Sequence, residues 1–381
     1  MWFALIGTAI FLTLTYCALI IVYYTWFKRL QYFSANATLL PVTRFSVIIP
    51  ARNEELNIEQ CARSILQNDY PKNLYEVIIV DDFSDDATSA IIKKLQEEFS
   101  TLKLIELKNF VGTKLNSYKK KSIETAIANS SFEWIVTTDA DCEVNKQWLK
   151  LFDNFIQIND TVFIAAPVKF FNNNSFISIF QCLDFLSLQG ITAASVSAGF
   201  HSMCNGANLA YKKEAFISVN GFKGVDNIAS GDDMLLMHKI QQRFPNKTGY
   251  LFHKKIIVST PPMPDIKSFI NQRIRWASKA TSYSDKKIFY VLLLVYVFNF
   301  CLFMLPFIAI FNHQSFLYWF ALLIFKTCCE LIFMFPVAKF FDQQKLLWWF
   351  PVMQPFHIVY TVISGLLGKF GKYEWKGRTV K

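Results

Sequence analysis

Long apolar runs lie toward both ends of the chain. The first, residues 2–27, contains no charged residue and exceeds the roughly 20 residues needed to cross the hydrocarbon core of a bilayer. A cleaved signal peptide would begin with basic residues and have a shorter apolar stretch, so we predict a retained membrane anchor. Lys28 and Arg29 follow this run directly. Because basic residues tend to stay on the cytoplasmic side of a membrane, this end of the run is expected in the cytoplasm.

Three further apolar runs follow near the C-terminus: residues 288–311, 316–338 and 346–367. The second contains Lys326 and Glu330, one helical turn apart, a spacing that favours an ion pair. The third contains Pro351 and Pro355 and is compatible with a kinked span or a re-entrant segment. Four full spans would put the basic tail 369–381 outside, whereas a re-entrant segment would return it to the cytoplasm.

Between the apolar runs, strand and helix signals alternate. β-Branched runs predict buried strands, and the segments between them have helical character. The predicted strands cover residues 45–49, 77–80, 102–107 and 134–138, and the predicted helices cover 54–68, 88–99 and 117–128. Such alternation is typical of a parallel α/β sheet, in which ligands bind beyond the C-terminal ends of the strands. The polar clusters that follow residues 49, 80 and 138 should therefore converge on one crevice.

The predicted organisation has five parts. They are a membrane anchor at 1–29, an α/β domain at 44–262, an interfacial amphipathic helix at 265–284, membrane segments at 288–368 and a basic tail at 369–381. The formal charge of +10 gathers beside the membrane runs and fits attraction to anionic lipid headgroups. We expect no nucleic-acid partner, because no nucleic-acid motif accompanies this charge. The eight Cys form no CxxC pair and the five His show no ligand spacing, which argues against a disulfide framework, a zinc site or a Ser–His–Asp triad.

Asp139 and Asp141 come directly after the predicted strand 134–138. Alternate residues of an extended turn can direct two carboxylates toward one ion. Hard cations such as Mg²⁺ and Mn²⁺ take such oxygen ligands and share them with substrate phosphates. The alternative is an acidic turn that caps a helix starting near Asn145. We favour the metal role, because the pair ends a buried strand and has partner clusters.

The other strand ends also carry polar residues. Asp81 and Asp82 follow strand 77–80 and could accept hydrogen bonds from a base or a ribose hydroxyl, since they lie too early to cap the helix from Thr88. The segment 50–55 leaves the first strand. It is either a nucleotide contact beside a helix N-terminus or a plain turn capped by Asn53.

Lys119 is the first of three adjacent lysines before a helical stretch. Such a run is usually a solvated face, although one lysine could reach a diphosphate. Asp232 and Asp233 follow Gly231 and precede the apolar helical stretch 234–237. They are either helix caps or, in a crevice beside a metal, a general base and its neighbour, and the spacing leaves both interpretations open.

The motif Gln272-Arg273-Ile274-Arg275-Trp276 lies on the amphipathic segment 266–280, just before a membrane run. The pattern predicts an interfacial helix with a Trp anchor. Gln272, Arg275 and Trp276 share one face of it by their i, i+3, i+4 spacing, so a role in a site is compatible with the interfacial position.

Taken in order, these clusters resemble those of the membrane-bound family 2 glycosyltransferases, whose cytosolic catalytic domain has the α/β fold called GT-A. The resemblance runs from about residue 44 to 279, and the flanking membrane runs suit the family as well. The segments that carry it are Val47–Glu55, Val80–Ser84, Thr138–Asp141, Gly231–Asp233 and Gln272–Trp276.

The resemblance implies a role for each cluster. The nucleotide of the donor, usually a uridine diphosphate, would be held by Pro50, Arg52, Glu54 and Asp81 or Asp82. Lys119 matches a family Lys that follows a Gly, here replaced by Tyr118. Asp139 and Asp141 would face an Mg²⁺ or Mn²⁺ ion and the diphosphate.

The same resemblance assigns the acceptor side. The family's catalytic Glu-Asp pair aligns with Asp232 and Asp233, which makes Asp233 the expected general base. Asn205 and Gly206 look like the acceptor-side segment. Gln272, Arg275 and Trp276 would close over the diphosphate and the acceptor.

The implied reaction is a single displacement with inversion, from a nucleotide sugar to an acceptor hydroxyl. The Q-x-x-R-W pattern occurs in processive polysaccharide synthases and in enzymes that glycosylate one lipid. Four spans are few for a wide polymer channel, so we favour a lipid or lipid-linked acceptor. A non-enzymatic scaffold would be indicated by loss of Asp139, Asp141 or Asp233, and all three are present. We expect a bacterial inner-membrane protein whose catalytic domain faces the cytoplasm.

Overall fold

The chain divides into two compact units. The computed structural model describes residues 2–112, 115, 117–201, 203–279, 285–370, 373–375 and 378–380. The helical unit comprises Met1–Leu30, Phe171–His201 and Pro262–Tyr373, and the sheet unit comprises Gln31–Phe170, Ser202–Pro261 and Glu374–Lys381. The sequence suggested one continuous domain over 44–262. The structure instead groups Phe171–His201 with the helices.

A seven-stranded sheet forms the core of the sheet unit, in the order β3-β2-β1-β4-β7-β5-β8. Its strands are β1 (Phe45–Ala51), β2 (Tyr75–Asp81), β3 (Leu102–Glu106), β4 (Trp134–Thr137), β5 (Phe163–Ala165), β7 (Leu209–Lys212) and β8 (Thr248–Tyr250). Strands β3, β2, β1 and β4 are parallel, and β7 runs antiparallel to both of its neighbours. A second, two-stranded sheet pairs β6 (Val168–Phe170) with β9 (Val258–Thr260), and a third pairs β10 (Tyr373–Trp375) with β11 (Arg378–Val380). The expected mostly parallel α/β architecture is confirmed.

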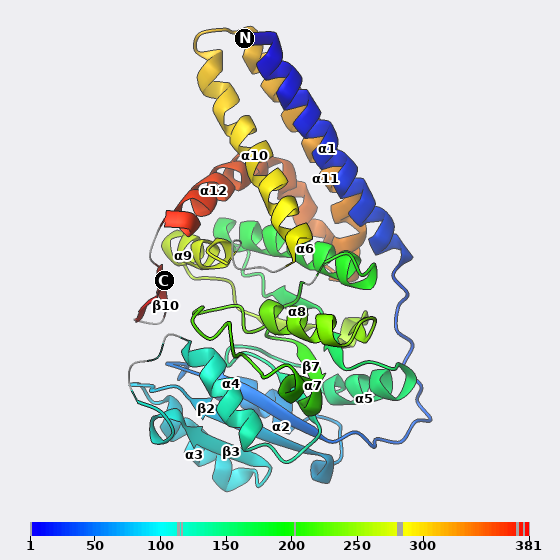
Figure 1. Ribbon diagram of the computed structural model, residues 1–381, viewed down its shortest axis with the longest axis vertical. Coiled ribbons are helices and arrows are strands. Elements are labelled where there is room, and N and C mark those ends of the chain that lie inside the picture. Colours follow the sequence, from blue (N-terminus) through cyan, green and yellow to red (C-terminus); the bar gives the residue numbers. More distant parts are fainter. Residues whose placement is uncertain are drawn as a thin grey trace. The chain divides into compact units, whose positions relative to one another are not determined.

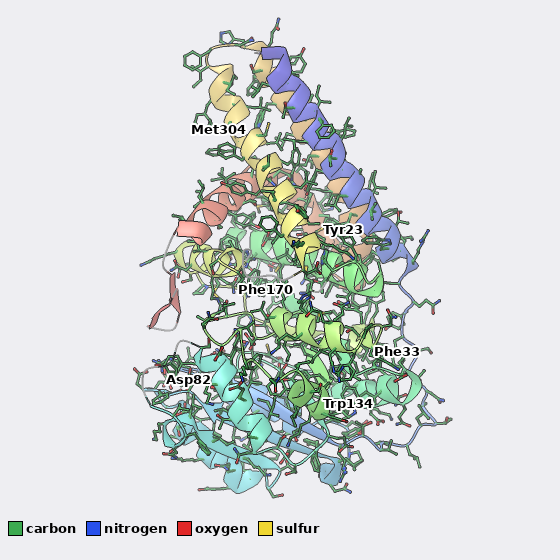
Figure 2. The ribbon with its side chains drawn as sticks, viewed as in Figure 1. Tyr23, Phe33, Asp82, Trp134, Phe170 and Met304 are labelled. Carbon is green, nitrogen blue, oxygen red and sulfur yellow. The ribbon has the colours of Figure 1, made fainter. Side chains whose placement is uncertain are left out.

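Strands β1, β2, β3 and β4 lie where the sequence predicted strands, whereas β5 and the later strands were not predicted. Continuous apolar runs suit strands that are buried on both faces. All seven residues of β2 are buried. Ala51 pairs with Asp81 and Ile48 with Thr137, which brings the C-terminal ends of β1, β2 and β4 to one edge of the sheet. Figure 2 labels Asp82, just beyond that edge, and Trp134 at the opposite edge.

Helices cover the sheet of this unit. They are α2 (Ile58–Leu66), α3 (Thr88–Glu98), α4 (Tyr118–Ala128), α5 (Trp148–Ile158), α7 (Lys213–Ser218) and α8 (Met234–Arg243), with 3₁₀ turns at Lys72–Leu74, Leu107–Asn109 and Lys254–Ile256. Helix α2 packs against α3, and α4 packs against β1 and β2 (Figure 1). Right-handed crossovers account for this arrangement, because the chain moves outward from β1 to β3 and then returns to β4. Helix α4 therefore presents its N-terminus at the polar edge.

One predicted helix boundary is wrong. The expected helix 54–68 begins only at Ile58. Asn53 has φ +50°, residues 55–57 form a turn, and Asn57 is the residue that precedes the helix. The helix N-terminus is therefore not beside Arg52, and any contact of this loop with a nucleotide must come from the loop itself.

The helical unit contains α1 (Trp2–Arg29), α6 (Phe176–Ser197), α9 (Ile266–Ala277), α10 (Lys286–Ala309), α11 (Gln314–Phe340), a 3₁₀ turn (Gln344–Trp349) and α12 (Phe350–Phe370). Figure 1 shows α1 alongside α11, with which it packs. Residues 280–284 of the expected interfacial segment, and the side chains of the basic tail 369–381, lie outside the described part of the chain.

Five helices of the described chain are long and apolar enough to cross a membrane, one more than the sequence suggested. The additional helix is α6, of which 72% of the most apolar window is buried, compared with 28–44% in the other four. Helix α12 continues through Pro355. Large apolar side chains on α1, α10, α11 and α12 are exposed, as expected of surfaces that face lipid. These features are consistent with a membrane protein.

The predicted ion pair of α11 is present. Lys326 Nζ lies 2.7 Å from Glu330 Oε1, and both side chains are buried. Gln354 of α12 donates to Glu330 Oε2 at 2.7 Å, and the Tyr16 hydroxyl of α1 donates to Glu330 Oε1. A buried carboxylate requires such partners, so the pair ties three helices together.

Candidate active site

A lysine and two carboxylates form the centre of the polar edge. Lys119, in the first turn of α4, places its Nζ 2.7 Å from Asp139 Oδ1 and 3.1 Å from Asp232 Oδ2. Asp139 follows β4, and Asp232 immediately precedes the residue that caps α8. Three segments distant in sequence are thus joined by one ammonium group. Among the three lysines at 119–121, the structure brings Lys119 to the strand ends.

The electrostatics of this cluster keep Lys119 charged. Burial favours the neutral amine and lowers the pKa of Lys119, but the carboxylates of Asp139 and Asp232 oppose it, and the net effect raises the pKa. The Asp139 side chain is 37% exposed and that of Asp232 only 10%. A ligand can therefore approach the cluster from the side of Asp139.

Asp233 lies beside this cluster and caps α8. Its Oδ1 accepts from Met234 N at 2.7 Å, and its Oδ2 accepts from Gly206 N at 3.2 Å. The capping interpretation is therefore correct for Asp233. Capping is compatible with a role as general base, because a carboxylate has further lone pairs that can accept a proton or a hydrogen bond.

Gly206 permits the close approach of these groups. A Cβ at this position would lie 3.2 Å from Asp232 Oδ2, 3.4 Å from Lys119 Nζ and 3.7 Å from Asp233 Cβ. The Thr137 hydroxyl donates to Gly206 O at 2.9 Å, which fixes the glycine against β4. Asn205 Oδ1 accepts from Ala207 N within the same turn. The expected acceptor-side segment is thus in contact with the two carboxylates that precede α8.

The loops after β1 and β2 hold each other. Arg52 Nη1 donates to the carbonyl oxygens of Asp82 at 2.8 Å and Phe83 at 2.6 Å. Glu54 N donates to Thr88 Oγ1 at 2.8 Å. Asn53 and Phe83 both have positive φ, +50° and +53°, so both loops adopt conformations that cost energy. Strain of this kind is often retained at binding sites.

Asp81 and Asp82 are both buried at this edge, and Pro50 pairs with Val80 at the end of β1. Asp81 Oδ1 accepts from Ser84 N at 3.2 Å. Burial raises the pKa of Asp81, although the hydrogen bonds from Ser84 lower it.

Asp139 and Asp141 are suited to a shared metal ion only in part. Both lie in the turn after β4, and Asp141 Oδ1 accepts from the thiol of Cys142. Among the described residues, no group of three or more His, Cys, Asp or Glu side chains gathers to hold a metal. Mg²⁺ and Mn²⁺ are commonly held by one or two carboxylates together with substrate phosphates. The two aspartates fit such an ion when a diphosphate supplies the remaining ligands.

The Gln272–Trp276 motif belongs to the helical unit, on α9. Gln272, Arg275 and Trp276 are half-buried, whereas Arg273 is buried. Sequence reasoning did not select Arg273, because charge on an interfacial helix usually faces headgroups. Its partner, Asp184 of α6, was missed as well. The signal that could have revealed Asp184 is a single charge within a helix of 22 residues that is otherwise uncharged.

Comparison with known proteins identifies the family. Residues 46–219 match the model of glycosyl transferase family 2, and residues 134–361 match that of glycosyl transferase family group 2, which covers more than half of the chain. The chain belongs to the family 2 glycosyltransferases. The expectation from the sequence is thereby confirmed at the level of family and fold.

Individual relatives of this family 2 glycosyltransferase align over part of their length. It is 33% identical to glycosyltransferase AglE of Haloferax volcanii over 105 residues, 28% of this chain and 33% of AglE. It is 24% identical to poly-beta-1,6-N-acetyl-D-glucosamine synthase of Staphylococcus aureus over 234 residues, 60% of this chain and 53% of the synthase. The chain thus spans about a third to a half of these relatives.

The fold of this glycosyltransferase is similar to that of the mannosyltransferase PcManGT of Pyrobaculum calidifontis, solved in complex with GDP-Man and Mn²⁺, with a TM-score of 0.58 and 19% identity. The match covers 93% of this chain and 99% of PcManGT.

Proposed function

We propose that the protein is an inverting glycosyltransferase that moves a sugar from a nucleotide-diphosphate sugar, with a UDP-sugar as the expected donor, to a hydroxyl of a membrane lipid or lipid-linked acceptor. The observation that carries this proposal is the cluster of Lys119, Asp139, Asp232, Asp233 and Gly206 at the C-terminal edge of the sheet. Ligands of α/β sheets bind at that edge. The Lys119 ammonium group lies among these carboxylates, where it can bind the diphosphate of a nucleotide sugar.

The donor would bind along the loops after β1, β2 and β4. Pro50, Arg52, Glu54, Asp81 and Asp82 line the first two loops, and we assign the nucleotide to them. Arg52 and Glu54 are already oriented by contacts with the second loop. Pre-oriented groups lose less freedom when a ligand binds. Lys119 and Asp139 would then meet the diphosphate.

A divalent cation is expected with the donor. Asp139 and Asp141 are the residues that would hold Mg²⁺ or Mn²⁺, and PcManGT, which shares the fold, binds Mn²⁺ together with GDP-Man. The ion would supply positive charge opposite the departing diphosphate. Lys119 Nζ, 2.7 Å from Asp139, would contribute a further positive charge to that leaving group.

Asp233 is the proposed general base. As the acceptor oxygen forms its bond to the anomeric carbon, the bond from that carbon to the diphosphate oxygen breaks, and Asp233 takes the proton of the attacking hydroxyl. The Gly206 and Met234 N–H groups orient its carboxylate. Asp232 is held by Lys119 and would maintain the charge balance of the site. Asn205 and Gly206 would contact the acceptor, and Gln272, Arg275 and Trp276 would close the site.

Packing inside the helical unit favours a lipid over an extruded polymer. Tyr16, Phe298, Lys326 and Phe333 are buried in its interior. A wide aqueous channel would instead leave polar groups such as those of Tyr16 and Lys326 in contact with water. The long alignment with poly-beta-1,6-N-acetyl-D-glucosamine synthase supports a processive enzyme as the second candidate.

The membrane location follows from the apolar helices, and we assign the bacterial inner membrane with the sheet unit in the cytoplasm. Lys28 and Arg29 at the end of α1 support that side.

The test is donor turnover by purified protein in detergent. A panel of UDP- and GDP-sugars with Mg²⁺ or Mn²⁺ is incubated with and without extracted membrane lipids, and products are sized by mass spectrometry. Lipid-dependent nucleotide release with one added sugar is the expected result. A ladder of additions would favour the processive candidate, and silence across the panel would contradict the proposed activity.

A further inference from the structure

Asp184 is a buried charge on α6. It is the only charged residue of this helix, and its side chain is 2% exposed. Its Oδ2 accepts from Arg273 Nε at 2.9 Å and from Nη2 at 2.5 Å. Its Oδ1 accepts from the Tyr360 hydroxyl, and His357 Nε2 lies 4.0 Å away. Burying a carboxylate is costly unless it is paired and hydrogen-bonded, so Asp184 is held in one place by groups from two other helices.

Arg273 connects this carboxylate to the Gln272–Trp276 motif. Its guanidinium is 4.2 Å from the centre of the Trp276 ring and 4.6 Å from that of Phe269. Its Nη1 donates to Gln272 Oε1 at 2.6 Å. A planar guanidinium can stack on rings and form hydrogen bonds with its edge at the same time. The contact between Arg273 and Asp184 therefore constrains both Gln272 and Trp276.

Aromatic packing keeps the pair dry. The Phe180 and Phe269 rings pack edge-to-face at 5.5 Å, and each packs edge-to-face on Tyr360. Phe185 of α6 also lies against Trp276, with ring centres 6.2 Å apart. In such surroundings an ion pair tolerates little displacement, because any movement leaves a charge without its partner.

We infer that Asp184 is a positioning residue: through Arg273, it fixes the side chains of Gln272 and Trp276 for the transfer reaction. The inference rests on the proposed function for its kinetic consequence only. Buried ion pairs often add little net stability, yet they select one geometry. Within α9, a helix of 12 residues, the contact between Arg273 and Asp184 acts together with the aromatic packing of Phe269. By binding Arg273, Asp184 holds the group that contacts both Gln272 and Trp276.

The test uses the full chain in detergent, labelled with 5-fluorotryptophan. Of the nine tryptophan resonances expected from the composition, Trp276→Phe identifies the one of interest by its loss. Asp184→Asn removes the charge and keeps the shape of the side chain. We expect the Trp276 resonance to shift or broaden. We also expect kcat to fall about 10- to 100-fold, as misplaced groups commonly cause, while the KM for the donor changes less than about threefold. Asp184→Glu keeps the carboxylate and should partly restore both the wild-type Trp276 resonance and kcat.

Glu330→Gln is the matched control. It also removes a buried carboxylate from the helical unit, but Glu330 pairs with Lys326 rather than with α9. We expect it to lower thermal stability and to leave the Trp276 resonance unchanged. If Asp184→Asn destabilises the protein to the same extent without moving the resonance, Asp184 has a structural role only and the inference is overturned.

Two further arms keep the result interpretable. If Asp184→Asn does not fold, Tyr360→Phe removes only a hydroxyl from Asp184 and should shift the resonance in the same direction by less; an unmoved resonance would overturn the inference. If the wild-type protein transfers no sugar from any donor, the proposed function fails while the fluorine signal still reports on positioning.

Discussion

Replacing Asp233 by Asn probes both duties of this carboxylate. In the wild type its two oxygens accept from Gly206 N at 3.2 Å and from Met234 N at 2.7 Å. An Asn has one acceptor oxygen and one NH₂ group. One of the two backbone N–H groups must then face the NH₂ group or lose its partner. The substitution therefore removes the base and also weakens the cap of α8.

The two effects differ in size. Loss of a cap costs about 1 kcal/mol, and loss of a hydrogen bond to a charged group costs about 1.5–3 kcal/mol. Loss of a general base lowers the rate about 10²- to 10⁴-fold, equivalent to about 3–5 kcal/mol in the barrier. Domains are commonly stable by about 5–15 kcal/mol, so the variant should stay folded and bind the donor while transfer is largely abolished.

The assay measures donor affinity by titration calorimetry and turnover by nucleotide release. Asp233→Ser is the matched variant, because a serine can accept from Met234 N as a cap but cannot serve as an effective base. We expect both variants to bind the donor within about threefold of the wild type, since Asp233 lies on the acceptor side, and both to lose transfer. Full turnover by Asp233→Asn would refute the base assignment. Recovery of turnover by Asp233→Ser would show that capping is the only role.

Three other outcomes test the electrostatics. Lys119→Met should tighten the binding of Mn²⁺ in the absence of donor about tenfold, because it removes a positive charge beside Asp139. Lys121→Met, on the same helix, is the control. Equal Mn²⁺ affinities of Lys119→Met and the wild type, measured by electron paramagnetic resonance, would contradict the expectation. EDTA should stop transfer and Mg²⁺ or Mn²⁺ should restore it, and undiminished activity in EDTA would remove the metal from the mechanism. Lys326→Met should cost about 3–5 kcal/mol in thermal unfolding, because it leaves Glu330 buried without its cation; adding Glu330→Gln should recover more than half, and a single-variant cost below about 1 kcal/mol would contradict this.

The sequence determined the order and type of the elements that frame the site. The strand that ends before Asp82 and the strand that ends before Asp139 are short β-branched runs, a pattern that predicts buried strands. Because parallel strands share one edge, the convergence of their polar ends followed as well. The apolar runs identified four of the five long helices. Helix α6, most of which is buried, was recognised only in the structure.

Only the tertiary structure decided which charges on distant segments meet. The run of three lysines did not distinguish Lys119 from its neighbours, although the family resemblance selected it. Its contact with Asp139 and Asp232 depends on how α4 and α8 approach β4. The late start of α2 came from a turn at residues 55–57, in a loop whose Asn53 N donates to Ser84 Oγ of the loop after β2. Asp184 and Arg273 are 89 residues apart, and no sequence pattern connects the helices α6 and α9 on which they lie. Local preferences fix helices and strands, but the pairing of charges on different elements depends on distances in space that no local preference encodes.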